Sequence, residues 1–363
     1  MIRVVYSADV FETQRRGGVS RYFVELATQL YYLGQIEPSF STAVHINTHL
    51  KESLFGSGWY LPVSPPRIRA SNTIRRLNHF YSKSLTSRRK FEIRHETFYQ
   101  GGVNSLNAIK TVTTVYDLIR EKSMNNWHGF HNKQDSLSRA DAIICISQTT
   151  RDDLPNFYQV DLDKVVVVPL GVSDIFKCDL GSLEKKRKRY KLLYVGSREG
   201  YKDFKTLLHA FSYSKFLKEN MEVLVFGSRF NKLEENLMES LGVKNNFWEL
   251  SGDDKALASA YQDSLALILT STYEGFGLTV LEAMMSGCVV ISTRGGSLGD
   301  VAGNFDVYFE PSNPYSLIEA IEEVVSQDSS RLLLTLKAQK YAESFTWEKT
   351  ALQTTDVYKS LLS

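Results

Sequence analysis

The sequence alternates between short apolar runs rich in β-branched residues and longer stretches of helical period, and this alternation constrains the fold more than any other feature. In the second half each apolar run is followed by a segment that can form a helix, which is typical of βα units around a parallel sheet. The runs there cover residues 191–196, 222–227, 246–250, 265–270, 288–293 and 307–310. They predict an α/β fold with a doubly wound sheet.

The first half repeats the pattern less regularly and predicts a second Rossmann-like domain, in which a long helix opens after Gly17 and Gly18. Its strands are expected near residues 2–7, 39–46, 111–115, 142–146 and 165–168. The charged run 184–191 predicts a linker near 171–190, with a binding patch as the alternative. The predicted domains are therefore residues 1–175 and 176–345.

The final segment, residues 346–363, spaces its apolar side chains like an amphipathic helix. We expect this helix to return to the first domain, as is typical when two such domains face each other across a cleft. In open α/β folds ligands bind at the carboxyl ends of the strands, so we expect the site in that cleft.

Composition excludes several classes. A net charge of +2 does not indicate a nucleic-acid binder, although the first 175 residues carry 21 Lys and Arg against 16 Asp and Glu. Three widely separated cysteines suggest neither a disulfide framework nor a zinc site, which fits a reducing cytoplasm. The sequence shows no signal-peptide pattern and no apolar stretch of about 18 residues. We expect a cytoplasmic protein.

The most informative motif follows the strand at 265–270. There a loop, Glu274-Gly275-Phe276-Gly277, leads into a helix that Leu278 and Thr279 begin. Glycines let the backbone approach a ligand closely, and the free amides and dipole of a helix N-terminus favour an anion such as a diphosphate. This stretch predicts a phosphate-binding loop.

Two carboxylates lie next to this loop. Because they would repel a phosphate, we expect them to contact another part of the ligand. Glu282, in the first turns of the helix, can accept hydrogen bonds from a ribose diol, and Glu274 can reach the sugar end of the same ligand. The alternative is that neither residue contacts a ligand. Glu274 would then be a charge at the helix N-terminus, and Glu282 an ordinary surface residue.

Further candidates follow other strands. Arg198 and Lys202 come after the strand at 191–196, where two cations can stabilise a departing diphosphate without a metal. Gly17 and Gly18 can bring their amides close to a phosphate or donor sugar, and Gly252 follows the strand at 246–250. The alternatives are ordinary surface cations and simple turns.

These residues carry a family resemblance. Glu274 and Glu282, set in YEGFGLTVLEAMMSG, resemble the signature of retaining, nucleotide-sugar-dependent family 4 glycosyltransferases of the GT-B fold. Segments 17–30, 165–172, 193–211 and 294–303 resemble family segments in the expected order. The resemblance implies that residues 275–278, Arg198 and Lys202 hold the donor diphosphate, and that neither a cofactor nor a metal is strictly required. It also implies Glu282 at the ribose and Glu274 at the sugar.

The resemblance also points to the first domain, where many members carry His-Asp and this chain has Tyr116-Asp117. Tyr116 is a neutral hydrogen-bond partner rather than a ready base, so a role that needs an imidazole is in doubt. Asp117 is expected either to contact the sugar or to cap a helix. His95, with Tyr116 and Arg21, is a candidate for the acceptor site, although a lone histidine is more often structural.

One segment suggests a further partner. Residues 67–94, from Arg67 to Arg94, hold nine Lys and Arg against the single acid Glu92, interleaved with aromatic residues. Such a helix either lies on an anionic membrane surface or is an ordinary solvated face.

The expected function is retaining transfer of a sugar from a nucleotide-diphosphate donor to a glycan or lipid-linked glycan. The leading donor is GDP-mannose, in O-antigen or capsule synthesis, at the inner face of the membrane. Three alternatives stay open: a UDP-sugar donor, a GT-B phosphorylase that would need a pyridoxal phosphate lysine, and a non-catalytic nucleotide-sugar binder.

Overall fold

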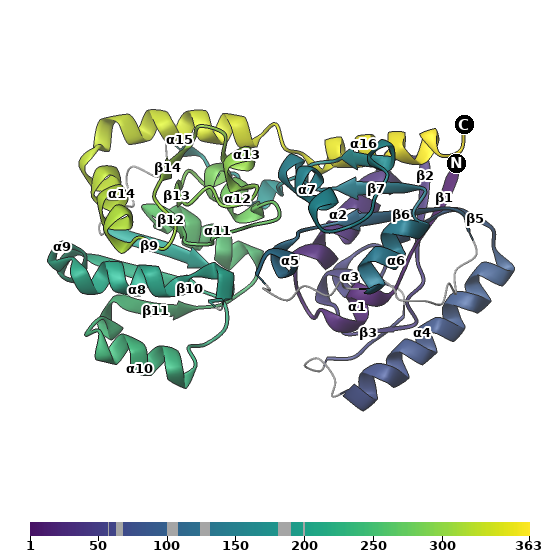
Figure 1. The fold of residues 1–363 in the computed structure, drawn as a ribbon, viewed down its shortest axis with the longest axis horizontal. Helices are drawn as coiled ribbons and strands as arrows, with labels where there is room; N and C mark the ends of the chain where they lie inside the picture. Colours follow the sequence, from purple (N-terminus) through teal and green to yellow (C-terminus); the bar gives the residue numbers. More distant parts are fainter. Residues whose placement is uncertain (57, 63–67, 100–107, 124–130, 181–189, 199) are drawn as a thin grey trace. The chain divides into compact units, whose positions relative to one another are not determined.

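The computed structural model describes residues 1–56, 58–62, 68–99, 108–123, 131–180, 190–198 and 200–363. The chain forms two compact units, Met1–Gly171 with Trp347–Ser363, and Val172–Thr346 (Figure 1). The sequence placed this boundary at residue 175. Most of the charged run 184–191, and Arg67, lie outside the described residues.

The first unit contains a six-stranded parallel sheet in the order β2-β1-β5-β6-β7-β8. The strands are β1 (Ile2–Tyr6), β2 (Ile36–Phe40), β5 (Phe91–Glu96), β6 (Ala108–Val115), β7 (Ala142–Cys145) and β8 (Val165–Val167). The predicted strand 39–46 is wrong: β2 starts earlier and ends at Phe40, opposite Tyr6 in β1. The chain then forms the short β3 (Val44–His45), which pairs with β4 (Trp59–Tyr60). The Asn78 side-chain oxygen holds the start of this segment by accepting hydrogen bonds from the Ala43 and Val44 amides.

Eight α-helices of the described residues belong to the first unit. They are α1 (Asp9–Thr13), α2 (Gly18–Tyr32), α3 (Thr48–Glu52), α4 (Ile68–Arg88), α5 (Ile119–Ser123), α6 (His131–Arg139), α7 (Gln148–Asp153) and α16 (Trp347–Ser360). As expected, α2 begins right after Gly17, and its apolar face, including Phe23 and Leu26, is buried. The C-terminal helix α16 packs on α2, with the Trp347 and Tyr22 rings 6.3 Å apart.

The second unit has a parallel sheet in the order β11-β10-β9-β12-β13-β14. Its strands are β9 (Tyr190–Val195), β10 (Met221–Phe226), β11 (Phe247–Leu250), β12 (Ala266–Leu269), β13 (Val289–Ser292) and β14 (Asp306–Tyr308). Its helices are α8 (Phe204–Tyr213), α9 (Lys215–Asn220), α10 (Lys232–Ser240), α11 (Asp254–Asp263), α12 (Leu278–Met285), α13 (Leu298–Ala302), α14 (Pro314–Ser326) and α15 (Asp328–Ala342). All six strands lie where the alternation predicts them.

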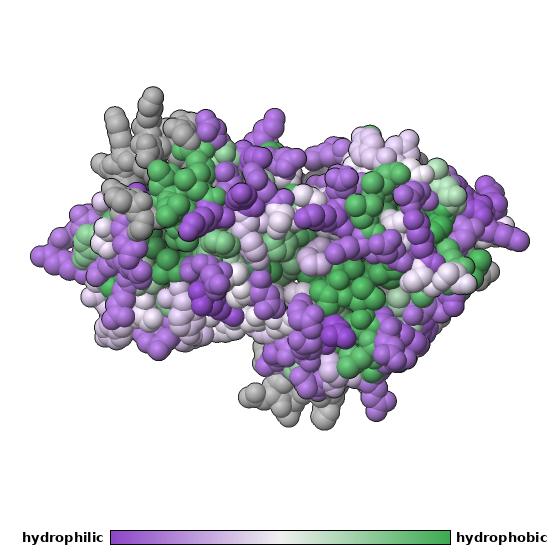
Figure 2. All heavy atoms as spheres, turned by 90° about the horizontal axis from the view of Figure 1, so that it is seen from above, coloured by the Kyte–Doolittle hydropathy of each residue, from purple (hydrophilic) through white to green (hydrophobic). Residues whose placement is uncertain are grey.

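Each sheet is covered by helices that bury its apolar side chains (Figure 1). Because the strands of each sheet are all parallel, the loops at their carboxyl ends lie along one edge of that sheet. Figure 2 looks onto the side of α15 and shows apolar patches within a mostly hydrophilic surface. Exposed leucines of α15 include Leu332, Leu333 and Leu336. None of the helices in the described ranges is long and apolar enough to cross a membrane.

Candidate functional site

The centre of the candidate site is an ion pair between Lys202 and Glu274 in the second unit. The Lys202 Nζ lies 2.5 Å from the Glu274 Oε1, and the two side chains are 17% and 13% exposed. Lys202 follows β9 and Glu274 follows β12, two neighbouring strands of the parallel sheet. The fold therefore brings two predicted site residues, 72 positions apart, to one strand edge.

The loop 294–297 holds the backbone of Glu274. The Glu274 amide donates to the Gly295 carbonyl at 3.1 Å, and the Glu274 carbonyl accepts from the Ser297 amide at 3.0 Å. A Cβ at Gly296 would lie 2.3 Å from the Glu274 oxygen, and the φ of Gly296 is +65°. Gly295 and Gly296 therefore support the loop that carries Glu274.

The helix α12 begins behind this loop, with Gly277 at its N-terminus in a left-handed conformation, φ +93°. Gly275 precedes it, and Leu278 and Thr279 form the first turn, where helix amides lack intrahelical acceptors. The Phe276 ring is buried, with its centroid 6.4 Å from that of Phe345. Phe276 can therefore offer its backbone to a ligand more readily than its ring.

Glu282 lies in the interior of the unit and is not the surface residue that the alternative interpretation required. Its carboxylate is 4% exposed and accepts a hydrogen bond from the Tyr261 hydroxyl at 3.1 Å. The Tyr261 ring is held in turn by Phe176, at 5.9 Å between ring centroids. Buried carboxylates need polar partners, and Tyr261 supplies one.

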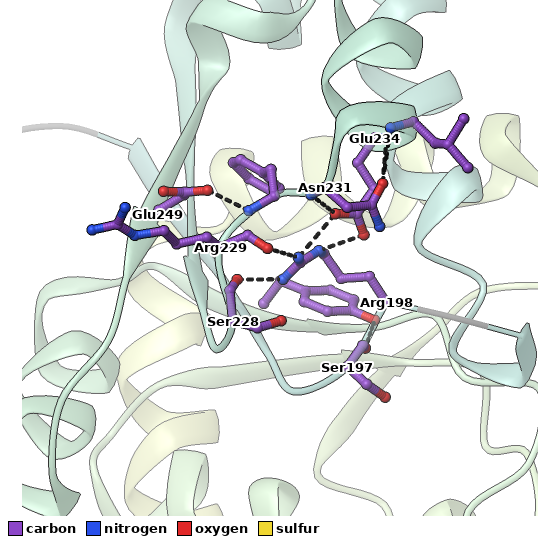
Figure 3. Close-up of polar contacts among 10 residues, drawn as sticks. Ser197, Arg198, Ser228, Arg229, Asn231, Glu234 and Glu249 are labelled. Carbon is purple, nitrogen blue, oxygen red and sulfur yellow. Dashed lines mark hydrogen bonds and ion pairs between the residues drawn. The ribbon is translucent and has the colours of Figure 1, made fainter. Parts of the chain in front are cut away.

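Arg198 forms hydrogen bonds with protein groups rather than presenting an open guanidinium (Figure 3). Its Nε and Nη2 donate to the two Glu234 oxygens at 2.8 and 2.9 Å. Nη1 and Nη2 also donate to the Ser228 and Arg229 carbonyls, at 2.9 and 2.8 Å. The side chain is 3% exposed and stacks on Phe230. Arg198 is therefore not the ordinary surface cation of the alternative interpretation. Its buried side chain links the end of β9 to the loop 228–231.

The sequence reasoning missed Glu234. It completes a capping box with Asn231 at the start of α10, a spacing that the sequence displays. Burial by itself would raise the pKa of the Glu234 carboxyl. Hydrogen bonds from the Arg198 side chain and the Asn231 amide outweigh this effect and hold that pKa below its ordinary value. The capping box could have revealed the helix start, but not the pairing with Arg198.

Gly252 lies between β11 and α11, and a Cβ there would meet the Ala256 Cβ at 2.5 Å. The next residue, Asp253, caps α11 by accepting from the Ala256 amide at 2.9 Å. Gly252 thus permits a tight entry into α11 at the carboxyl end of β11.

In the first unit, the predicted glycine loop leads directly into α2. Gly17 has extended backbone, and a Cβ there would meet the Gln14 side chain at 2.7 Å, whereas Gly18 faces open space. Arg21 lies in the first turn, where its amide donates to the Gly17 carbonyl at 3.0 Å.

Tyr116 and Asp117 follow β6 at the carboxyl edge of the first sheet. The Tyr116 hydroxyl donates to the Thr97 carbonyl at 3.0 Å, and burial raises the pKa of this phenol well above its ordinary value. The Asp117 Oδ1 accepts from the Ile119 amide at 3.1 Å, as the capping interpretation predicts. Tyr116 is therefore a buried phenol whose hydroxyl is engaged within the unit, and its contact with an acceptor stays a prediction.

His95 lies in the interior of the first unit. It is fully buried, with Nδ1 2.7 Å from the Tyr358 hydroxyl and Nε2 2.8 Å from the Thr114 hydroxyl. Burial lowers the pKa of His95 to about 3. Both ring nitrogens are engaged inside the unit, so the structure favours the structural alternative over the acceptor contact.

The basic segment is split between surface and core. Arg75, Arg76, Lys83 and Arg88 of α4 are exposed, together with Leu77, Phe80 and Tyr81. Arg94 is 1% exposed in β5 and pairs with the buried Glu96, so it does not belong to a surface patch.

Two family models match the chain. The one described as Glycosyltransferase Family 4 matches residues 16–174, and the one described as Glycosyl transferases group 1 matches residues 179–341. The two matches correspond to the two halves in which the candidate residues lie.

Among similar proteins, O-antigen chain mannosyltransferase B of Escherichia coli is 26% identical over 240 residues, which cover 62% of this chain and 62% of that protein. MMP alpha-(1->4)-mannosyltransferase of Mycolicibacterium hassiacum is 27% identical over 252 residues, 67% of this chain and 60% of that protein. The match thus spans under two thirds of the length of each relative.

A solved structure, Anabaena HepE in complex with UDP-glucose, superposes with a TM-score of 0.77 at 14% identity. The superposition covers 99% of this chain and 100% of that one. At this identity the likeness concerns the fold alone.

Proposed function

We propose that this chain, whose two halves match the Glycosyltransferase Family 4 and Glycosyl transferases group 1 models, is a family 4 glycosyltransferase on a GT-B fold. In this proposal it moves a sugar from a nucleotide-diphosphate donor to a glycan or lipid-linked glycan, with retention of configuration. The observation that carries the proposal is the Lys202–Glu274 pair beside the N-terminus of α12. A cation, a carboxylate and a helix N-terminus at one strand edge suit a ligand with an anionic and a sugar end.

In the proposed mechanism the donor diphosphate binds at the amides of residues 275–278 and at Lys202, with Glu282 toward the ribose and Glu274 toward the sugar. As the bond between sugar and phosphate lengthens, negative charge develops on the leaving oxygens, and Lys202 and the amides stabilise it. A phosphate oxygen takes the acceptor proton on the same face, so no protein nucleophile is needed. We further propose that the reaction requires no metal.

Arg198 contributes by holding the loop 228–231 beside this site, since its donors are largely occupied by Glu234 and two carbonyls. Asp117 and Arg21, with the Gly17–Gly18 loop, contribute from the first unit, toward the donor sugar and acceptor.

The proposed donor is GDP-mannose, and the proposed setting is O-antigen or capsule synthesis. Two similar proteins are described as mannosyltransferases, one of them acting on the O-antigen chain. A UDP-sugar is the second candidate, because the HepE structure holds UDP-glucose on the same fold.

We also propose that α4 contacts an anionic membrane surface from the cytoplasmic side. Exposed cations and the exposed side chains of Leu77, Phe80 and Tyr81 share this helix, and each cation near such a surface contributes about 1 kcal/mol. Sedimentation with vesicles that contain anionic lipid tests this, with neutral vesicles as control. The double variant R76E/K83E should lose the binding, and wild-type protein that ignores both vesicle types would refute it.

The experiment for the donor is a thermal-shift panel of GDP, UDP, ADP and their common sugar conjugates, because a ligand that binds only the native state raises its stability. A shift with GDP and GDP-mannose supports the mannosyltransferase proposal, and a shift with a UDP-sugar replaces the donor. No shift with any nucleotide would contradict sugar transfer.

Release of nucleoside diphosphate is then measured with glycan acceptors. Binding of the donor without any release would favour the non-catalytic binder. Turnover that persists in EDTA is expected, whereas loss of turnover that Mn²⁺ or Mg²⁺ restores would refute the metal-independent mechanism.

A further inference from the structure

A buried ion pair lies directly under the turn that carries Asp117. The Lys133 Nζ in α6 is 2.7 Å from the Glu121 Oε1 in α5, and the two side chains are 5% and 2% exposed. The same Nζ donates to the Asp117 carbonyl at 2.8 Å. One ammonium group thus joins two helices to the residue that follows β6.

Aromatic side chains enclose this pair. The Tyr158 hydroxyl donates to the Glu121 Oε1 at 2.6 Å, and the Lys133 Nζ lies 4.8 Å from the Tyr99 ring centroid and 5.4 Å from that of Tyr158. Burial lowers the pKa of Lys133, although the Glu121 carboxylate opposes this shift. The ammonium is therefore held in a low-dielectric pocket with defined partners.

Stability alone gives little reason for such a pair. Moving two charged groups out of water is unfavourable, and a pair of apolar residues of similar volume often stabilises a fold equally well. What an apolar pair could not supply is the hydrogen bond to the Asp117 carbonyl. On the other side of the same residue, the Asp117 carboxylate accepts from the Ile119 amide.

We infer that Lys133, held by Glu121, is a positioning residue that fixes the Asp117 turn for sugar transfer. The inference rests on the proposed function, in which Asp117 acts from the first unit. Lys133 itself needs no contact with substrate, because it acts through the backbone of Asp117.

The test uses the double variant E121Q/K133M in the full chain, which removes both buried charges and still offers the Tyr158 hydroxyl an amide oxygen at position 121. K110M is the matched control, because Lys110 pairs with Asp141 at 3.2 Å near the opposite end of the same strand, β6. Because a misplaced catalytic group loses rate, we expect kcat to fall on the order of tenfold or more in the double variant. The donor KM should stay within twofold, and K110M should match wild type.

The mechanism of the effect is tested in the D117A background. If Lys133 acts through Asp117, adding E121Q/K133M to D117A should change kcat by less than twofold. An equal loss in both backgrounds would show that Lys133 acts elsewhere, and wild-type kcat in E121Q/K133M would overturn the inference outright.

Hydrogen exchange separates this inference from the proposed function. Amides of residues 116–121 should exchange at least tenfold faster in E121Q/K133M than in wild type or K110M. Unchanged exchange would refute positioning whatever the activity. Faster exchange in a protein whose wild type transfers no sugar would instead refute the proposed function.

Discussion

His95 and Tyr358 are separated by 263 positions in the sequence, yet the His95 Nδ1 lies 2.7 Å from the Tyr358 hydroxyl in the interior of the first unit. The Tyr358 hydroxyl also lies 3.3 Å from that of Tyr6. This chain of polar contacts attaches the C-terminal helix α16 to the strands β1 and β5. The Thr114 hydroxyl lies at the other ring nitrogen, and burial of the ring favours the neutral imidazole in the native state.

The neutral imidazole makes the stability of the chain depend on pH. The pKa of His95 is lowered to about 3, from an ordinary value of 6.5. Between pH 3 and pH 6.5 the imidazole is therefore protonated in the unfolded chain and neutral in the native state. The free energy of unfolding should therefore fall as pH decreases from 6.5 toward 3, by about 1.4 kcal/mol per pH unit from this group.

Urea unfolding of wild type and of H95Q between pH 4 and pH 8 measures this slope. Glutamine does not titrate, so the slope in H95Q should be smaller below pH 6.5. Parallel curves for the two proteins would show that His95 is not the group responsible.

Removing the Glu274 carboxylate should abolish most turnover and leave the fold intact. In E274Q and E274A we expect kcat to fall on the order of 10²-fold, as for the loss of a charged group that acts on the transition state. The control is E239Q, which breaks the exposed Glu239–Lys244 pair, at 2.6 Å, on the surface of the same unit. Nucleoside diphosphate release measures the rates, and near wild-type activity in E274Q would remove Glu274 from the mechanism.

Gly296→Ala tests the support of Glu274. The φ of +65° disfavours alanine, and its Cβ would also collide with the Glu274 carbonyl oxygen. Gly242 has the same φ with nothing within 4 Å, so G242A measures the backbone cost alone. We expect G242A to lose about 1 kcal/mol of stability and G296A clearly more, with loss of turnover. Equal losses and intact activity in both variants would contradict the supporting role of the loop.

The Arg198–Glu234 cross-link should contribute to stability without any ligand. R198M leaves the Glu234 carboxylate without its charged partner, and hydrogen bonds to charged groups contribute about 1.5–3 kcal/mol each. Thermal unfolding of the ligand-free protein should show a clear loss in R198M and partial recovery in R198M/E234Q. R229M is the control, because the Arg229 side chain is exposed and only its carbonyl takes part. An R198M protein as stable as wild type, but unable to bind nucleotide, would restore Arg198 as a direct diphosphate ligand.

The spacing of apolar residues predicted those helix starts and strands that the neighbouring sequence determines. The starts of α2 at Gly18 and of α12 at Leu278 follow from a glycine placed before an apolar helical pattern, and the βα rhythm predicts the six strands of the second unit. The separate strand β3 could not be predicted in this way, because the amides of residues 43 and 44 at its start donate to Asn78, 35 and 34 positions later in the chain.

In the candidate site, too, features set by the neighbouring sequence could be predicted, whereas contacts between distant segments could not. The juxtaposition of Glu274, Lys202 and the N-terminus of α12 could be predicted, because all three come after strands of one parallel sheet and so lie at its carboxyl edge. The hydrogen bonds of Arg198 with Glu234 were missed, and the partner of His95 could not be named. Glu234 and Tyr358 reach these side chains only through the folded arrangement of distant segments. Lys133 gave no signal either, because a lysine in a polar helix resembles any surface lysine until its burial is known.

The return of α16 to the first unit has a consequence for the order in which a ribosome-made chain can mature. When residue 171 leaves the ribosome, the nascent first unit still lacks the helix that covers Tyr22 and bonds to His95. The second unit, being continuous, can complete its fold earlier than the unit that precedes it. A chain whose synthesis stops before Tyr358 would thus keep all the donor-side residues and still expose an unfinished core, which marks it for removal by proteases.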